Sequence, residues 1–213
     1  MYHGSEVPTL RDLFTKVPQD RLLRLTHLTL HGARIRVDPL TLPHLRSLVY
    51  LDLNRLYAMS PADTDDINDT WECTSAADDI FATLAREKIH LKQVVTNHID
   101  DVLLDYLYSC SGLETLEMSS VYSSTTTKSH AFAHRFYKDI LPKLVDSIQV
   151  LIIRPLYEGG WCYNVDDVFS VLSQCKKLRS LTICFDSASA SSNSDNTVCS
   201  FDMRFFAYLT DSM

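Results

Sequence analysis

One spacing of mostly apolar residues occurs six times along the chain, and this repetition limits the possible folds more than any other feature. Each copy follows L-x-x-L-x-L or a close variant, with a further position three residues upstream. The sets are Leu22, Leu25, Leu28, Leu30; Leu45, Leu48, Leu51, Leu53; Lys88, Leu91, Val94, Thr96; Cys110, Leu113, Leu116, Met118; Val145, Ile148, Leu151, Ile153; and Cys175, Leu178, Leu181, Ile183. Such a repeat predicts one supersecondary unit used several times.

The last two positions of each set predict a short β-strand. They are two residues apart, so both side chains lie on one face of the strand and the residue between them lies on the other. The central positions, 28, 51, 94, 116, 151 and 181, are separated by 23, 43, 22, 35 and 30 residues. The two shortest separations fit a leucine-rich repeat of about 20 to 29 residues, and the longer ones require insertions or longer helices.

Amphipathic stretches precede several of these strands and predict helices. Apolar residues recur every three or four positions from Ile99 to Leu107 and again from Val165 to Leu172. One helix and one strand per repeat predict an α/β fold, a right-handed leucine-rich-repeat solenoid of about six irregular repeats. Its parallel strands would line the concave face, its helices would lie outside, and residues 1–213 would form a single domain.

Three polar stretches interrupt the repeats. Residues 57–79 contain seven acidic side chains and predict an inserted surface loop. The serine-rich segment 187–200 predicts disorder, because few apolar side chains are present to offset the entropy of ordering. The shorter run 119–129 predicts a flexible insertion. After the second stretch, a helical pattern beginning at Phe201 starts a seventh repeat that no strand completes, which favours a truncated or fragmentary chain.

The charge and the apolar runs of the chain exclude some functions. A net charge of −7 argues against nucleic-acid binding, since Lys and Arg supply most of the affinity for phosphates, and no cluster of basic residues stands out in the sequence. The first residues lack a basic start and an apolar core, and no apolar run approaches the roughly 20 residues that span a bilayer. We therefore expect a cytoplasmic or nuclear protein without membrane contact.

The six cysteines contain no C-x-x-C pair. Cys110 and Cys175 occupy the same repeat position, just after a helix, where cysteine acts as a small buried apolar residue. We expect free thiols in a reducing compartment, and disulfides are the alternative.

Two cysteine-containing segments, CSGLETLEM and CKKLRSLTI, resemble the repeats of the ribonuclease-inhibitor-like class. The irregular spacing is similar to that of F-box-associated leucine-rich-repeat proteins of fungi, over roughly residues 8 to 186. The resemblance implies repeats that recognise a protein substrate, and a separate F-box that recruits a ubiquitin-ligase scaffold. The apolar pattern of residues 7–14 is too short for an F-box, so the recruiting function does not carry over to this chain.

Aspartates suggest a metal site at one place. Asp100, Asp101 and Asp105 have the spacing D-D-x-x-x-D, one residue longer than the magnesium motif of terpene synthases. Asp166 and Asp167 repeat the pair at the matching place in another repeat. Because carboxylates stabilise the first turn of a helix, a recurring helix start explains both pairs better than a metal site does.

Other candidate sites are weaker. His130 and His134 are one helical turn apart, but Ala131 replaces the glutamate of the zinc-protease pattern. The stretch 63–69 resembles a calcium loop and lacks its glycine and its bidentate glutamate. We predict no catalytic residue, no metal and no cofactor, and hence no enzyme; a hydrolase or metal enzyme is the most distant alternative.

The residues between the leucines indicate where a partner would bind. Most of them are polar, but Val150 and Ile152 are not, and with Tyr50 and Val95 they are predicted to form an apolar strip on the concave face, with Arg154 at its margin. The strip is either covered by another part of the chain or exposed as a docking site. The sequence therefore predicts a protein-protein interaction module of unknown partner, within a ubiquitin-ligase assembly if the missing module exists. A degenerate fragment without activity is the first alternative.

Overall fold

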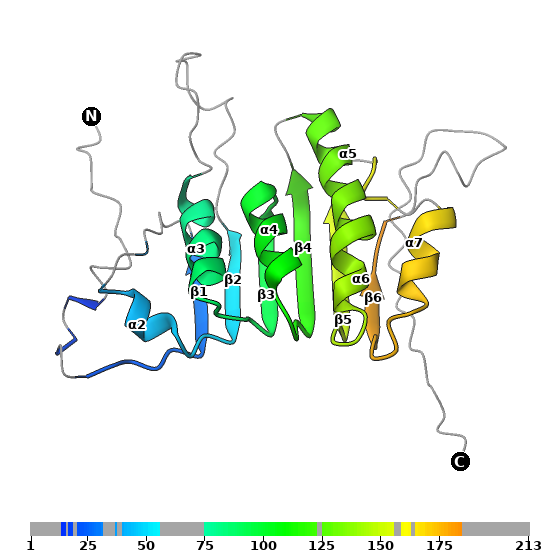
Figure 1. The fold of residues 1–213 in the computed structure, drawn as a ribbon. Helices are drawn as coiled ribbons and strands as arrows, with labels where there is room; N and C mark the ends of the chain where they lie inside the picture. The colour runs from blue at the N-terminus through cyan, green and yellow to red at the C-terminus, as the bar shows by residue number, and fades with distance from the viewer. Residues whose placement is uncertain are drawn as a thin grey trace, which may run out of the picture.

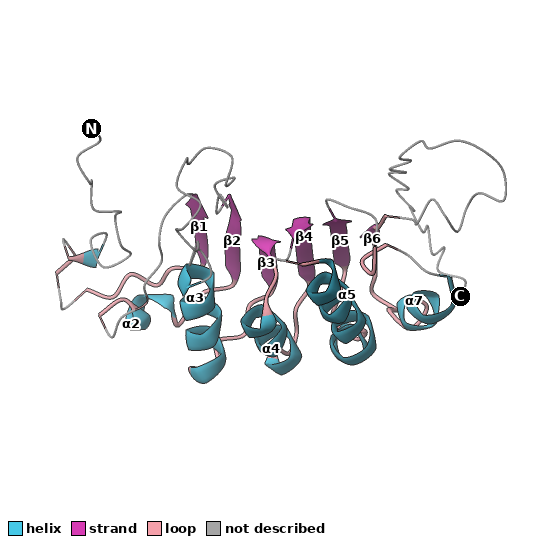
Figure 2. Cartoon of the chain, turned by 90° about the horizontal axis from the view of Figure 1, so that it is seen from above, coloured by secondary structure: helices cyan, strands magenta, loops and turns pink. Residues whose placement is uncertain are grey.

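The computed structural model describes residues 14–15, 17–18, 21–31, 37, 40–55, 75–122, 125–155, 159–162 and 165–184. In this part of the chain, one β-sheet carries a layer of helices on one side (Figures 1 and 2). Most of the predicted acidic loop, the serine-rich segment 187–200 and the helix predicted from Phe201 lie outside the described residues.

In the described part of the chain, six parallel strands form the sheet, and their order in space is their order in the chain. The strands are β1 (His27–His31), β2 (Tyr50–Arg55), β3 (Gln93–His98), β4 (Thr115–Tyr122), β5 (Val150–Pro155) and β6 (Ser180–Thr182). The central positions of the six sets are paired directly across neighbouring strands: Leu28, Leu51, Val94, Leu116, Leu151 and Leu181. The six sets are unequally spaced in the sequence, but the structure aligns them in one common register.

A row of backbone hydrogen bonds just before the strands holds this register. The amide of Lys92 donates to the carbonyl of Val49 at 2.9 Å, and the amide of Glu114 donates to the carbonyl of Lys92 at 2.7 Å. The same bond recurs along the whole row, which consists of Thr26, Val49, Lys92, Glu114, Gln149 and Arg179. Because a slip by one residue would turn the buried side chains to the opposite face, the row and the leucines specify the same alignment.

Helices connect the strands and lie on one side of the sheet (Figure 2). They are α2 (Leu42–Leu45), α3 (Ser75–Arg86), α4 (Asp101–Ser109), α5 (Thr126–Arg135), a π-helical turn η2 (Phe136–Ile140), α6 (Leu141–Leu144) and α7 (Val165–Leu172). The helices predicted from the periodicity before β4 and before β6 are confirmed as α4 and α7. No helix in the described ranges is long and apolar enough to cross a membrane.

Two predicted loops contain regular structure. Residues 75–79, assigned from the sequence to the acidic loop 57–79, form the first part of α3. In the polar run 119–129, β4 continues to Tyr122 and α5 begins at Thr126. The polar composition led to the wrong prediction of a loop in both places. Acidic residues also suit the start of a helix, and a polar strand can be extended by pairing with its neighbour. Ser119 pairs with Arg154 of β5 in this extension.

The core lies between the sheet and the helices. Leu51, Leu116 and Leu151 are fully buried, and so is Thr96, the polar member of the third set. From the helical side come large aromatic residues, of which Phe136 and Trp161 pack with their rings 5.8 Å apart. The repeated apolar positions therefore face the helices, and the opposite side of the sheet is left to the residues that alternate with them.

Candidate protein-binding surface

The side of the sheet opposite the helices carries the residues that alternate with the buried leucines, and we call it the open face. These residues are His27, Thr29, Tyr50, Asp52, Gln93, Val95, Thr115, Glu117, Val150, Ile152, Ser180 and Thr182. Each is half-buried or exposed, and every described helix lies on the other side (Figure 2). The open face is thus the broad surface of the sheet that the described helices do not use for packing.

The register arranges the open face in two rows that run across the strands. The first row is His27, Tyr50, Gln93, Thr115, Val150 and Ser180. The second row is Thr29, Asp52, Val95, Glu117, Ile152 and Thr182. Neighbours within a row are about 4.8 Å apart, the spacing of paired strands, so their side chains are close enough to contact one another.

The five residues predicted to bind a partner lie on three strands of this face. Tyr50 lies on β2, Val95 on β3, and Val150, Ile152 and Arg154 on β5. The first four are half-buried and Arg154 is exposed. They do not form one continuous apolar strip, because β4 lies between β3 and β5. Its side chains Thr115 and Glu117 separate Val95 from the apolar pair on β5.

Glu117 places a negative charge in the middle of the open face. Its carboxylate accepts a hydrogen bond from the Ser119 hydroxyl at 3.0 Å and lies 3.5 Å from a guanidinium nitrogen of Arg154. The Arg154 side chain is 51% exposed and that of Glu117 25%, so this ion pair contributes at most about 1 kcal/mol to stability. Its larger effect is to present paired charges beside Ile152.

Tyr50 forms the aromatic end of the open face. Its hydroxyl donates to a carboxylate oxygen of Asp52 at 3.3 Å, and its ring packs against the ring of His27 with centroids 5.5 Å apart. Burial raises the pKa of the Tyr50 hydroxyl, and the charge of Asp52 raises it further. Tyr50 is therefore a neutral hydrogen-bond donor at physiological pH.

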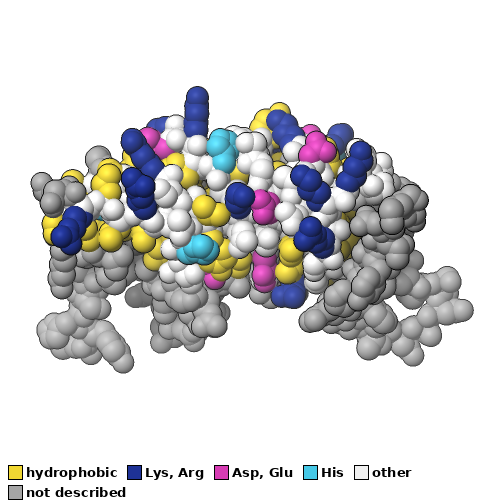
Figure 3. Space-filling view, turned by 90° about the horizontal axis from the view of Figure 1, so that it is seen from below, with side chains coloured by type: hydrophobic (Ala, Val, Ile, Leu, Met, Phe, Trp, Pro, Cys, Tyr) yellow, Lys and Arg dark blue, Asp and Glu magenta, His cyan; other side chains and the backbone are white. Residues whose placement is uncertain are grey.

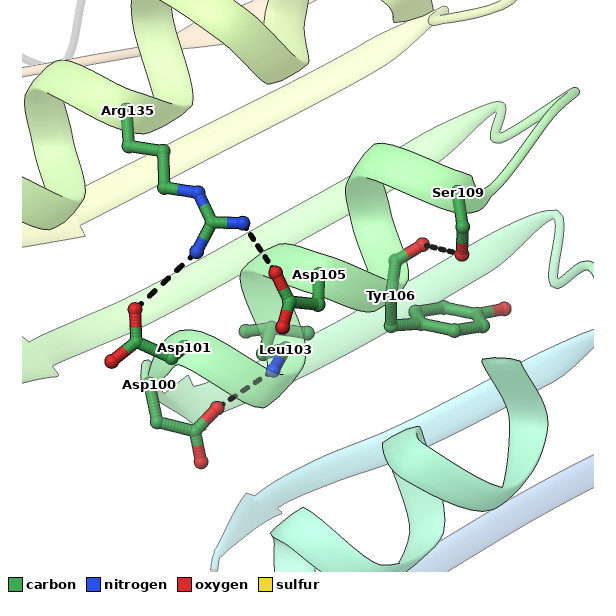
Figure 4. Close-up of polar contacts among 7 residues, drawn as sticks. All are labelled: Asp100, Asp101, Leu103, Asp105, Tyr106, Ser109 and Arg135. Atoms are coloured by element: carbon green, nitrogen blue, oxygen red, sulfur yellow. Dashed lines mark hydrogen bonds and ion pairs between the residues drawn. The ribbon is translucent and has the colours of Figure 1, made fainter. Parts of the chain in front are cut away.

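The aspartates that resembled a magnesium site serve the start of α4 and a contact between helices (Figure 4). Asp100 is the N-cap, and its carboxylate accepts from the amide of Leu103 at 2.7 Å. Arg135 of α5 lies 3.3 Å from Asp101 and also pairs with Asp105. Capping and ion pairing account for all three carboxylates. In the described ranges no three His, Cys, Asp or Glu side chains converge in a way that would hold a metal ion.

His130 and His134 both lie exposed on α5. The backbone of Gly160 approaches the first of them closely, since a Cβ atom added to Gly160 would lie 3.1 Å from both Cα and Nδ1 of His130. This close packing explains why position 160 is a glycine, which has no Cβ atom. The stretch 63–69, which resembled a calcium loop, lies outside the described residues.

The four described cysteines are not joined in disulfide bonds. Cys110, Cys162 and Cys175 are buried, and Cys184 is half-buried. Burial raises the pKa of the Cys110 and Cys175 thiols, which keeps them protonated near neutral pH and unsuited to nucleophilic attack. The equivalent positions of Cys110 and Cys175 are thus used for packing, as the sequence indicated.

The contact between Glu117 and Arg154 is a feature of the surface that sequence reasoning did not identify. The residues are 37 positions apart in the chain, and only the register between β4 and β5 brings them together. The sequence contained one signal for this contact. Glu117 and Arg154 both lie at positions that alternate with the repeated apolar residues, on two predicted strands that follow one another in the chain.

Comparison with known proteins gives no further assignment: no family model, no curated protein and no solved structure matches the chain.

Proposed function

We propose that this chain is a leucine-rich-repeat solenoid that works as a protein-interaction module and binds its partner on the open face. One observation carries the proposal. Six parallel strands follow one another in chain order with equivalent residues in register, while the described helices lie on a single side. Stacked units of one helix and one strand have this arrangement, and their exposed sheet face is the usual binding surface.

The side chains of the open face support a protein as the partner. Tyr50 and Arg154 belong to the residue types enriched at protein interfaces, and Val150 and Ile152 add an apolar patch beside them. Paired charges at Glu117 and Arg154 would select for a partner with complementary polar groups. A role in substrate recognition for an F-box-type ubiquitin ligase is a narrower form of this proposal, supported by the sequence resemblance.

The experiment replaces Ile152 with Asp and compares the proteins captured from the native host by mass spectrometry. Because Ile152 lies on the open face, a charge there should remove the partner and change the melting temperature by no more than about 2 °C. Phe169→Asp is the matched control, since Phe169 of α7 is 63% exposed on the helical side. This variant should retain every partner of the unmodified protein.

Each other outcome is informative. Unfolding of Ile152→Asp would show that the residue packs inside, and unchanged capture would contradict docking on the open face. A cullin scaffold among the captured proteins would support the ligase role. If the unmodified chain captures nothing that Ile152→Asp loses, the degenerate fragment becomes the better description.

A further inference from the structure

The loops that lead from the helices into the strands form one edge of the molecule, and basic side chains gather there. We call it the basic edge. Its cationic residues are Arg21, Arg24, Arg46, Arg86, Lys88, Lys92, Lys143, Lys176, Lys177 and Arg179, and every one of them is exposed. The acidic residues on the same segments are Glu87, Glu114 and Asp146. Figure 3 views the molecule from this side and shows Lys and Arg spread along the edge, with few acidic side chains among them.

On the rest of the described surface, acidic side chains outnumber basic ones. Away from the basic edge, the cations whose side chains are described are Lys128, Arg135, Lys138 and Arg154. Arg135 and Arg154 are paired with carboxylates. Since the whole chain has a net charge of −7, the concentration of cations on one edge is a local departure from an acidic background. A field of this kind attracts an anionic partner and orients it.

The acidic residues of the edge neutralise little of this charge. Glu87 lies 3.5 Å from Arg86, and Glu114 lies 2.9 Å from Lys92. Both pairs are partly exposed to water, where ion pairs are weak and easily exchanged for a better partner. The excess of cations is largest at the two ends of the edge, around Arg24 and Arg46 and around Lys177 and Arg179.

Interaction with helix dipoles explains only part of the pattern. Arg86 and Lys143 lie in the last turns of α3 and α6, where a cation stabilises the helix. Arg24, Lys92 and Arg179 lie on the strand side of the loops, beyond that influence. Lys92 and Arg179 belong to the hydrogen-bonded row that precedes the strands, so a rigid backbone fixes their positions.

Apolar side chains accompany the cations at one end of the edge. Leu22 and Leu23 are 59% and 41% exposed, between Arg21 and Arg24. The segment is held in place, because the amide of Leu23 donates to Nδ1 of His44 at 2.9 Å. Exposed leucines between arginines are suited to a ligand that has both acidic and apolar groups.

We propose that the basic edge is a second docking surface, and that it binds an acidic protein segment containing apolar residues. Five strand spacings give the edge a length of about 24 Å, which an extended segment of about seven residues would cover. Acidic side chains along such a segment would lie against the cations, and apolar side chains at one of its ends would lie against Leu22 and Leu23. The exposed leucines favour this ligand over a nucleic acid, which offers phosphates without apolar side chains.

The test measures fluorescence anisotropy with the full chain and a labelled peptide of about seven residues that has two Leu at one end and Glu at the other positions. The double variant Lys177→Glu, Arg179→Glu should weaken binding about tenfold or more, because it replaces attraction with repulsion at one end. The double variant Lys128→Glu, Lys138→Glu makes the same change in net charge away from the edge and should alter affinity less than about twofold. Substituting Leu22 and Leu23 with Ser should weaken binding of this peptide but not of a control peptide in which Ser replaces Leu.

Three results would overturn the proposal: no binding of the peptide that contains Leu and Glu, equal losses in the two charge variants, or tighter binding of a single-stranded oligonucleotide of equal charge. Tighter binding to vesicles of anionic phospholipid would likewise assign the edge to a membrane surface. Ile152→Asp separates the two docking surfaces, because it should leave peptide binding to the basic edge unchanged even if it removes the partner of the open face.

Discussion

At the scale of single residues, Tyr106 shows how the core accommodates polar groups. Its hydroxyl accepts a hydrogen bond from the amide of Leu91 at 2.9 Å and donates one to the carbonyl of Ile89 at 3.1 Å. The Cys110 thiol lies 3.7 Å from the same oxygen. These contacts tie α4 to the chain just before β3, at a position where backbone groups would otherwise be buried without partners.

This arrangement predicts a loss of stability in alkali. Burial raises the pKa of the Tyr106 hydroxyl above its usual value near 10, and it raises the pKa of the Cys110 thiol as well. Above about pH 9 the unfolded chain loses these protons while the folded chain keeps them, so the free energy of unfolding must fall as the pH rises. Urea titrations at pH 8 and at about pH 10.5 should show this decrease.

Tyr106→Phe provides the control for this prediction. The variant should lose about 1 to 3 kcal/mol at pH 8, because the amide of Leu91 becomes unpaired in the core. Its further decrease toward alkaline pH should be smaller than that of the unmodified chain. Tyr137, which is also buried with a raised pKa, should maintain some pH dependence in both proteins. Equal decreases in both proteins would show that Tyr106 does not contribute.

Residue roles were predictable from the sequence only where they are local. Asp100 was expected at a helix start, and its carboxylate accepts the amide three residues later. Arg135 was not identified as the partner of Asp101 and Asp105, since it lies 30 or more positions away on another helix. A cap can be predicted from the spacing of residues along one helix. A contact between two helices can be predicted only if their packing angle and their register are known.

At the scale of elements, the backbone just after α3 is strained at one residue, and a substitution can remove this strain. Lys88 has a φ of 55°, the left-handed conformation that favours glycine. The amide of Lys88 donates to the carbonyl of Ala85 at 3.1 Å, and the amide of Ile89 donates to the carbonyl of Leu84 at 2.9 Å. This is the hydrogen-bond pattern of a Schellman cap, and it usually has glycine where Lys88 stands.

Lys88→Gly should therefore raise the free energy of unfolding by about 1 kcal/mol, the cost of a left-handed conformation for a residue with a Cβ atom. Lys88→Ala is the matched control: it removes the same charge, retains the Cβ atom and should give no gain. Both are measured by urea denaturation at neutral pH. A gain of equal size in the two variants would assign the effect to charge at the helix end instead of backbone strain.

Elements with a clear apolar period were predictable, and those with polar sequences were not. The three-and-four spacing indicated α4 and α7, which the structure contains. The run 119–129 has no such period, yet its first residues extend β4 and its last residues begin α5. The cap at Thr125, whose hydroxyl accepts from the amide of Lys128 at 3.2 Å, is a local signal for this helix start.

At the scale of the whole molecule, the sequence indicated which residues share a face but not how surfaces assemble. The buried positions follow from a two-residue alternation within each set, and the parallel strands follow from one helix and one strand per repeat. The basic edge could not be recognised, because its cations occur one to three at a time in loops that are 20 or more residues apart. Likewise, the apolar strip expected on the open face is interrupted, since β4 contributes Thr115 and Glu117 at equivalent positions.

The same scale gives the last prediction, which tests the register through the core. Leu116 and Leu151 are fully buried and directly paired in the middle of the sheet. Replacing either with Ala should lower the free energy of unfolding by about 2 to 5 kcal/mol, through lost burial and the cavity that remains. Leu181→Ala is the control, because Leu181 lies half-buried on β6 at the end of the described sheet and should cost less.

Hydrogen exchange then distinguishes a stack of mutually supporting units from a sheet of independent strands. If each unit is stabilised mainly by its neighbours, Leu151→Ala should speed amide exchange in β4 and β6 as well as in β5. The effect should decline toward β1, four strands away from β5. A loss below about 0.5 kcal/mol for both central leucines would contradict the register, since a surface substitution costs no more. A large loss confined to β5 would contradict the coupling between neighbouring units.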